Sequence, residues 1–175
     1  MIEKCEENAL DPKTQRRESA EKIVNKYILL SGGAGLIPVP LFDQVSIAAI
    51  QAKMVYDLGQ NYNVEIATYR VRAIILSILG GAHSQWITRY IMGYLTMFVP
   101  GINVVGTLIT RPALAGAITY TIGKIFIKQF ENGATLESFD TEQARNEFAE
   151  HFKEGERFVR DQSKKAEGDV AQVSA

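Results

Sequence analysis

Cysteine and histidine are scarce in this chain, with one cysteine and two histidines among 175 residues. The lone Cys5 excludes an intrachain disulfide framework and a cluster of thiolate metal ligands. His83 and His151 lie on different predicted helices, so a zinc site would need ligands assembled from distant parts of the chain. The sequence therefore predicts no metal site.

Motifs of nucleotide-binding and acyl-transfer enzymes are also missing. The glycine-rich segment 31–35, SGGAG, follows a predicted helix and leads into prolines without a lysine or arginine. A phosphate-binding loop needs such a cation beside its backbone amides. No Gly-x-Ser-x-Gly sequence offers a nucleophilic serine. We therefore expect no catalytic residues, no cofactor and no enzymatic activity.

Charged residues are few in the middle of the chain. Residues 28–128 hold three acids and seven bases, whereas residues 1–27 hold six of each and residues 129–175 hold eleven acids and six bases. The middle is thus apolar and mildly basic, which weakly favours contact with an anionic surface. Basic and aromatic residues do not interleave as they do in a nucleic-acid groove, so we expect no nucleic-acid partner.

The two ends of the chain are polar. The first residues mix charges of both signs without an apolar run, which argues against a secretory signal peptide, so we expect the chain to start in the cytoplasm. A chain of this length favours one hydrophobic core. We predict a flexible segment over 1–11, a single helical domain over 12–162 and a disordered tail over 163–175.

The predicted fold is all-α, a helical bundle, because no segment alternates apolar and polar residues long enough for a strand. Asp11 and Pro12 are typical of an N-cap and a first helical residue. Asp140 is predicted to cap an amphipathic C-terminal helix whose apolar face carries Phe148, Phe152 and Phe158. The predicted helices cover 12–30, 40–62, 64–81, 84–98, 102–130 with a kink at Pro112, and 140–162.

The helix predicted over 40–62 is apolar on nearly every side, and we expect it to be the central helix of the bundle. Asp43 and Asp57 share one stripe but lie about 21 Å apart at 1.5 Å per residue, too far for an acid/base pair. Asp43 either meets the amides of the helix start or pairs with Arg89 or Arg111. The predicted core stripe consists of Ile47, Ile50 and Met54, extended by Leu58.

Residues 90–110 are 21 consecutive uncharged positions, which is long enough to span a bilayer. The turn-forming pair Pro100 and Gly101 divides this run. Proline interrupts a helix and glycine allows a positive φ, so the pattern favours a long apolar helical hairpin over one straight span. The predicted arms are drawn from 84–98 and 102–128.

Small residues recur at four-residue spacing at Ala115, Thr119 and Gly123. This spacing lets two helices approach closely, in lipid or in a protein core. The stripe does not separate the two settings.

Four stretches carry a family resemblance: IPVPLFDQVSIAAIQAKMVYDLGQNYNV, the pair GG, VPGINVVG and ALAGAITYTIGKIFIKQFENG. In these stretches the chain resembles the bacterial domain of unknown function 697 family, which includes YcjF-type proteins and is often fused or adjacent to GTPase domains. The resemblance covers roughly residues 20–155. The family-motif residues are Pro38, Pro40, Asp43, Gln51, Met54, Pro100, Gly101 and Gly123.

The resemblance implies a noncatalytic, membrane-associated helical module that works with a GTPase-type partner, which would be a separate protein. It implies a place on the cytoplasmic face of the inner membrane, peripheral or inserted through the hairpin. The expected partners are a GTPase-domain protein, membrane lipid and a second copy of the chain. Two alternatives remain open: a soluble cytoplasmic bundle that binds a partner protein or an apolar ligand, and an enzyme of unknown class.

Overall fold

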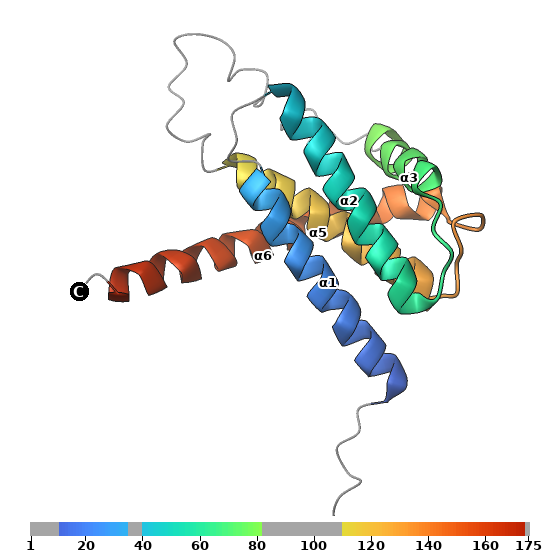
Figure 1. Ribbon diagram of the computed structural model, residues 1–175, viewed down its shortest axis with the longest axis horizontal. Helices are drawn as coiled ribbons and strands as arrows, with labels where there is room; N and C mark the ends of the chain where they lie inside the picture. The colour runs from blue at the N-terminus through green and yellow to red at the C-terminus, as the bar shows by residue number, and fades with distance from the viewer. Residues whose placement is uncertain (1–10, 35–39, 82–109, 174–175) are drawn as a thin grey trace, which may run out of the picture.

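The computed structural model describes residues 11–34, 40–81 and 110–173, and within these ranges it contains helices and no strand (Figure 1). The predicted all-α fold is confirmed. The hairpin tip at Pro100 and Gly101 lies outside the described residues. The helices are α1 (Pro12–Ala34), α2 (Pro40–Tyr62), α3 (Thr68–Gly81), α5 (Thr110–Glu131) and α6 (Thr141–Val173).

Helix α5 is the most enclosed helix of the bundle. It packs against α1, α2 and α6, and among residues 113–130 only Lys128 is exposed. Helix α2 instead keeps an exposed face with Lys53 and Tyr56. The prediction that the helix over 40–62 is the central one is therefore wrong. The physical reason is that α5 presents small or apolar residues on most of its surface, so that three neighbouring helices can pack around it.

Helix α2 ends in a left-handed cap. Asn63 has a φ of 57°, and the Val64 amide donates to the Gly59 carbonyl at 2.8 Å. This bond satisfies a carbonyl of the last helical turn. Residues 64–67 therefore connect two helices, and α3 begins at Thr68 instead of near Val64 as predicted.

The C-terminal end of α5 and the start of α6 lie close to their predicted positions. Gly133, with a φ of 80°, closes α5. The Asp140 side chain accepts a 2.8 Å hydrogen bond from the Gln143 amide, which confirms the predicted N-cap of α6. Pro112 lies in the first turn of α5, where its missing N–H costs no helical hydrogen bond. The predicted kink involves residues 102–109, which lie outside the described residues.

Helix α6 continues to Val173, beyond the predicted end at Gln162. Its C-terminal half extends away from the other helices (Figure 1). The structure is thus helical over residues 163–173, where the sequence predicted a disordered tail. The reason is intrinsic: this stretch contains alanine, lysine and glutamate and no proline, so the helix can continue without a core to bury.

Candidate functional site

Among the described residues no group of three or more histidine, cysteine or acidic side chains could hold a metal ion. His151 pairs instead with acids of its own helix. Its Nδ1 lies 3.2 Å from Glu154 Oε2, and its Nε2 lies 3.9 Å from Glu147 Oε2. His151 is thus part of an acidic face of α6, and His83 and Cys5 lie outside the described residues.

Two family-motif residues of α2 are in the core. Met54 is fully buried and Gln51 is 3% exposed, as expected for Met54 from the predicted stripe. Leu58 is also fully buried, whereas Ile50 is only half-buried. These side chains position α2 on the bundle.

Other motif residues are located in part or not at all. Pro40 begins α2 and Asp43 lies in its first turn, but their side chains are outside the described part. Pro38, Pro100 and Gly101 are outside it altogether. The cap and the ion pair considered for Asp43 therefore remain predictions.

Gly123 is the point of closest approach between α5 and α1. A Cβ at this position would lie 2.6 Å from Val24 Cγ2 and 2.8 Å from Val24 Cγ1. Real Cβ atoms do not come this close to a neighbour, so any larger residue here would force the Val24 side chain to move. Ala115 and Thr119 of the same stripe are buried as well. The small residues therefore serve a contact inside the protein bundle.

Gly155 likewise allows a close approach, in this case between α6 and α5, and it was not among the residues predicted from the sequence. A Cβ here would lie 2.8 Å from the Ala117 carbonyl oxygen and 3.2 Å from the Ala117 Cα. A signal was available, because an interior glycine weakens a helix by about 1 kcal/mol relative to alanine and calls for a packing reason.

A partly buried hydrogen bond joins α1 to α2. The Tyr27 hydroxyl, on a side chain that is 4% exposed, donates to Asp57 Oδ2 at 2.6 Å, and Lys53 forms an ion pair with Asp57 Oδ1. Burial acts to raise the pKa of Asp57, but hydrogen bonds from Lys53 and Tyr27 and attraction to Lys26 outweigh it and lower the pKa. Asp57 thus links a hydroxyl of α1 and a cation of its own helix α2.

The Tyr27–Asp57 link predicts how stability depends on alkaline pH. Burial, the hydrogen bond to Asp57 and its charge raise the pKa of Tyr27 from 10.0 to about 12. The folded state holds this proton more tightly than the unfolded state, so the contribution is complete below pH 10 and is lost as the pH rises towards 12. Chemical denaturation between pH 8 and 12 should show a decline in unfolding free energy that is shallower in Tyr27→Phe.

Asp57→Asn provides the acid-side comparison. The folded-state pKa of Asp57 is lowered, so its contribution is present above the unfolded value of 3.8 and is lost as the pH falls below it. The wild-type protein should therefore lose more stability than Asp57→Asn on acidification. Equal pH profiles for both variants and the wild type would contradict the proposed role of this link.

An exposed surface of lysines, leucines and a tyrosine lies on α1 and α2. Leu29 and Leu30, in the last turns of α1, are 72% and 48% exposed. Lys22 and Lys26 precede them at helical spacing on the exposed side. Lys53 Nζ lies 4.8 Å from the ring centroid of Tyr56 on α2. The α1–α2 surface is defined by these residues: Lys22, Lys26, Leu29, Leu30, Lys53 and Tyr56.

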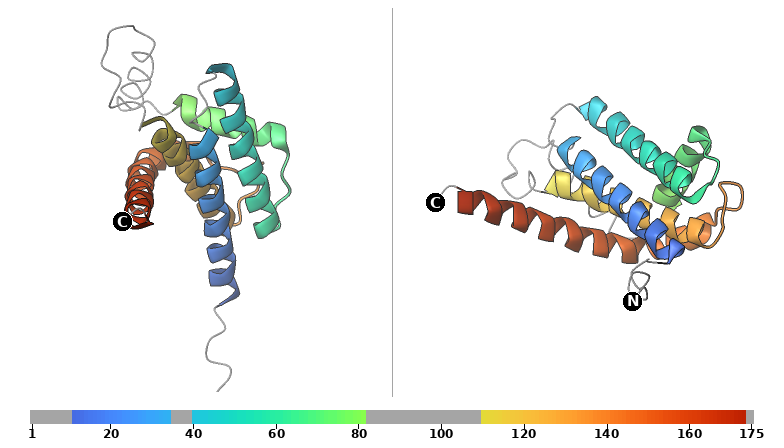
Figure 2. Two further views of the ribbon diagram at one scale, coloured as in Figure 1. Left: turned by 60° about the vertical axis from the view of Figure 1, so that its left-hand side comes forward. Right: turned by 60° about the horizontal axis from the view of Figure 1, so that its bottom comes forward.

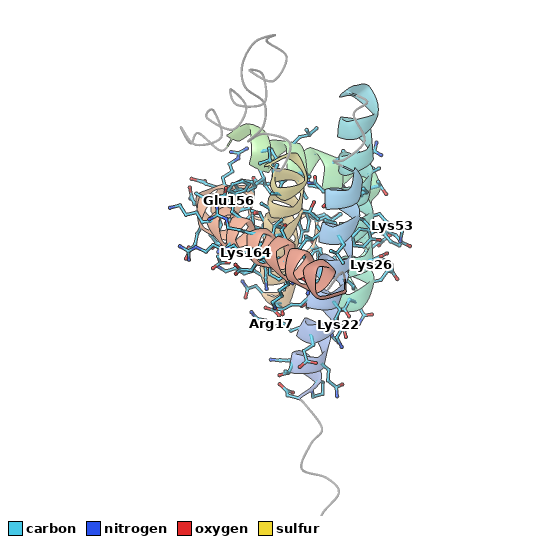
Figure 3. All side chains as sticks on the ribbon, turned by 90° about the vertical axis from the view of Figure 1, so that its left-hand side faces the viewer. Arg17, Lys22, Lys26, Lys53, Glu156 and Lys164 are labelled. Atoms are coloured by element: carbon cyan, nitrogen blue, oxygen red, sulfur yellow. The ribbon has the colours of Figure 1, made fainter. Side chains whose placement is uncertain are left out.

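Figure 3 shows the three lysines of the α1–α2 surface along one side of the bundle. Lys26 lies 5.1 Å from the Tyr27 ring centroid and contributes to the electrostatic field at Asp57. Within the described residues neither Lys22 nor Lys26 forms an ion pair. Their charges are therefore available to an external anion.

Within the described ranges, no helix combines the length and the apolar character needed to cross a bilayer. Residues 82–109 are outside these ranges.

Comparisons with known proteins give a family and a relative. The chain is 30% identical over 136 residues to "Magnetosome membrane protein 22" of Magnetospirillum gryphiswaldense, a match that covers 78% of this chain and 70% of the relative. No solved structure matches. Residues 4–157 match the family described as "Domain of unknown function (DUF697)". Because this match takes in most of the chain, the protein belongs to the DUF697 family.

Proposed function

We propose that this protein is a noncatalytic helical module that associates with the cytoplasmic face of the inner membrane and works with a separate GTPase-type protein. The membrane part is supported by the relative whose name describes a magnetosome membrane protein. The GTPase part is supported by the family resemblance, whose members often occur beside GTPase domains. The DUF697 family name assigns no reaction.

The observation that carries the membrane proposal concerns the borders of residues 82–109. This stretch of 28 residues contains one charged side chain, Arg89. It is bordered by the C-terminal end of α3 and the N-terminal end of α5, which both lie in the upper part of the bundle in Figure 1 and in the left view of Figure 2. A chain that leaves and re-enters at one end fits an apolar excursion into a bilayer, with the bundle outside it.

A cysteine at the predicted hairpin tip tests insertion. Gly101→Cys in a Cys5→Ser background should resist a membrane-impermeant thiol reagent in sealed membranes and react once detergent is added. The physical reason is that the bilayer excludes the charged reagent. A matched cysteine at Glu150, which is exposed on α6, should react without detergent in membranes whose cytoplasmic face is open.

Rapid labelling at position 101 without detergent, together with complete release of the protein by carbonate, would refute insertion. It would favour the soluble bundle that binds a partner protein or an apolar ligand. Carbonate extracts peripheral proteins. Complete release of the protein by carbonate would therefore contradict a bilayer-embedded tip even if the cysteine at position 101 resisted the thiol reagent.

The GTPase partnership has its own test. Cross-linking in native membranes should join the full chain to a protein with a GTPase domain, and the yield should differ between a non-hydrolysable GTP analogue and GDP. Such a difference is expected because switch segments of GTPases are ordered by the γ-phosphate. Cross-links that are independent of the nucleotide, or that contain no GTPase domain, would contradict the partnership.

A further inference from the structure

The α1–α2 surface combines two features that ordinary solvent-facing helices keep apart. Its leucines are large and exposed, and Lys22 and Lys26 precede them on the same helix. Leu29 alone exposes 72% of its surface. Such a combination is typical of helices that lie in the interface of a membrane, where apolar tips meet the acyl boundary and cations meet headgroups.

The four side chains of α1 lie on one face of the helix. At 3.6 residues per turn, Lys22, Lys26, Leu29 and Leu30 fall within about 100° of one another around the helix axis. A helix that lies in a membrane interface buries its apolar side about 5 to 10 Å into the boundary between headgroups and acyl chains. The leucines therefore reach the acyl boundary while the long lysine side chains of the same face extend to the level of the phosphates.

The charge distribution of the bundle favours the same orientation. Helix α1 carries five basic and two acidic residues, whereas α6 carries six basic and eight acidic residues. An anionic surface attracts the first helix and repels the second. The C-terminal end of α1, whose last turns hold Leu29 and Leu30, lies beside the N-terminal end of α5 (Figure 1).

We propose that the α1–α2 surface docks on anionic phospholipid, with Lys22 and Lys26 contacting phosphates and Leu29 and Leu30 entering the acyl boundary. The proposal rests on the membrane association proposed above and adds the lipid class and the face that meets it. Tyr56, with an amphipathic ring beside Lys53, belongs to the headgroup level of this contact. A neutral protein partner would use the leucines but would leave the unpaired lysines without a counter-charge.

A local probe on the full chain tests the proposal. Leu29→Cys in a Cys5→Ser background carries an environment-sensitive fluorophore, and the protein is reconstituted with vesicles of phosphatidylcholine alone or of phosphatidylcholine and phosphatidylglycerol in equal parts. The emission should shift to the blue and be quenched by spin-labelled lipid in the anionic vesicles. High salt should reverse the shift, because it screens the lysines.

Leu76→Cys is the matched control, because Leu76 is 70% exposed on α3, which packs on α2 and α6. Its probe should not respond to phosphatidylglycerol. In Lys22→Gln/Lys26→Gln, the association with anionic vesicles that the probe at position 29 reports should weaken about thirtyfold. The reason is that each lysine near an anionic surface contributes about a fivefold gain in association. Lys164→Gln/Lys165→Gln, with the same charge change on α6, should leave it unchanged.

Equal responses at positions 29 and 76, or none at position 29, would overturn the proposal. A response at position 29 that is the same in both vesicle types would also overturn it, since the lysines would then have no role. A shift that depends on protein concentration without vesicles would assign the surface to a second copy of the chain instead.

The result is independent of the insertion test at Gly101. If the probe at position 29 responds to anionic lipid but carbonate releases the protein, the docking proposal is supported and insertion is refuted. Insertion without a response at position 29 would keep the membrane function and reject the docking surface.

Discussion

Replacing Met54 by aspartate should abolish the folded bundle. Met54 is fully buried among core residues of α2 and its neighbours, and a carboxylate there would have neither water nor a partner. Leaving an uncompensated charge in a core costs at least about 4 kcal/mol, a large part of the stability of a single domain. Circular dichroism and limited proteolysis should therefore report loss of cooperative unfolding and rapid digestion.

Two controls separate the core effect from a simple change of charge. Met54→Leu keeps the volume and apolar character of the side chain and should cost less than about 1.5 kcal/mol. Ala49→Asp places the same carboxylate on an exposed position of α2 and should melt near the wild type. If Met54→Asp melts like Ala49→Asp, the core face of α2 has been assigned wrongly.

Gly155→Ala should destabilise the protein even though alanine is the better helix former. The added methyl would lie 2.8 Å from the Ala117 carbonyl oxygen, a backbone atom that cannot rotate away. Overpacking of this kind costs about 1 to 3 kcal/mol, which exceeds the gain of about 1 kcal/mol in helix propensity. Denaturant unfolding should show a lower midpoint with an unchanged slope.

Gly80→Ala is the matched control for this prediction. Gly80 is also helical, and a Cβ at this position would meet nothing within 4 Å. Alanine should therefore be neutral or slightly stabilising there. Equal effects at positions 80 and 155 would mean that helix propensity, and not the approach of α5 and α6, decides the outcome.

Gly123→Ala allows a sharper test, because its neighbour is a side chain. Val24 supplies the atoms that the new methyl would meet. Val24→Ala removes them, so the cost of Gly123→Ala should fall in the Val24→Ala background, and a double-mutant cycle should report favourable coupling. No truncation of a side chain can relieve Gly155 in this way. Additive effects at positions 24 and 123 would refute direct contact.

Local signals in the sequence determined the helical class and many helix ends. Asp140 caps α6 with its own carboxylate, and α5 ends close to the predicted residue 130, with Gly133 at a positive φ after it. These features depend on residues a few positions apart, so a sequence pattern contains their physical cause. The start of α3 was missed because the Asn63 cap looks like an ordinary polar residue in the sequence.

Tertiary structure decided which helices and which surfaces matter. The sequence placed Met54 and Gly123 in tight packing, but only the fold shows that Gly123 faces Val24 and that Gly155 faces Ala117. It also brings Tyr27 to Asp57, 30 positions away. The reason is that periodicity states which side of a helix is apolar or small but not which helix covers it. Long-range packing makes that choice, and it leaves Leu29 and Leu30 uncovered beside the lysines of α1.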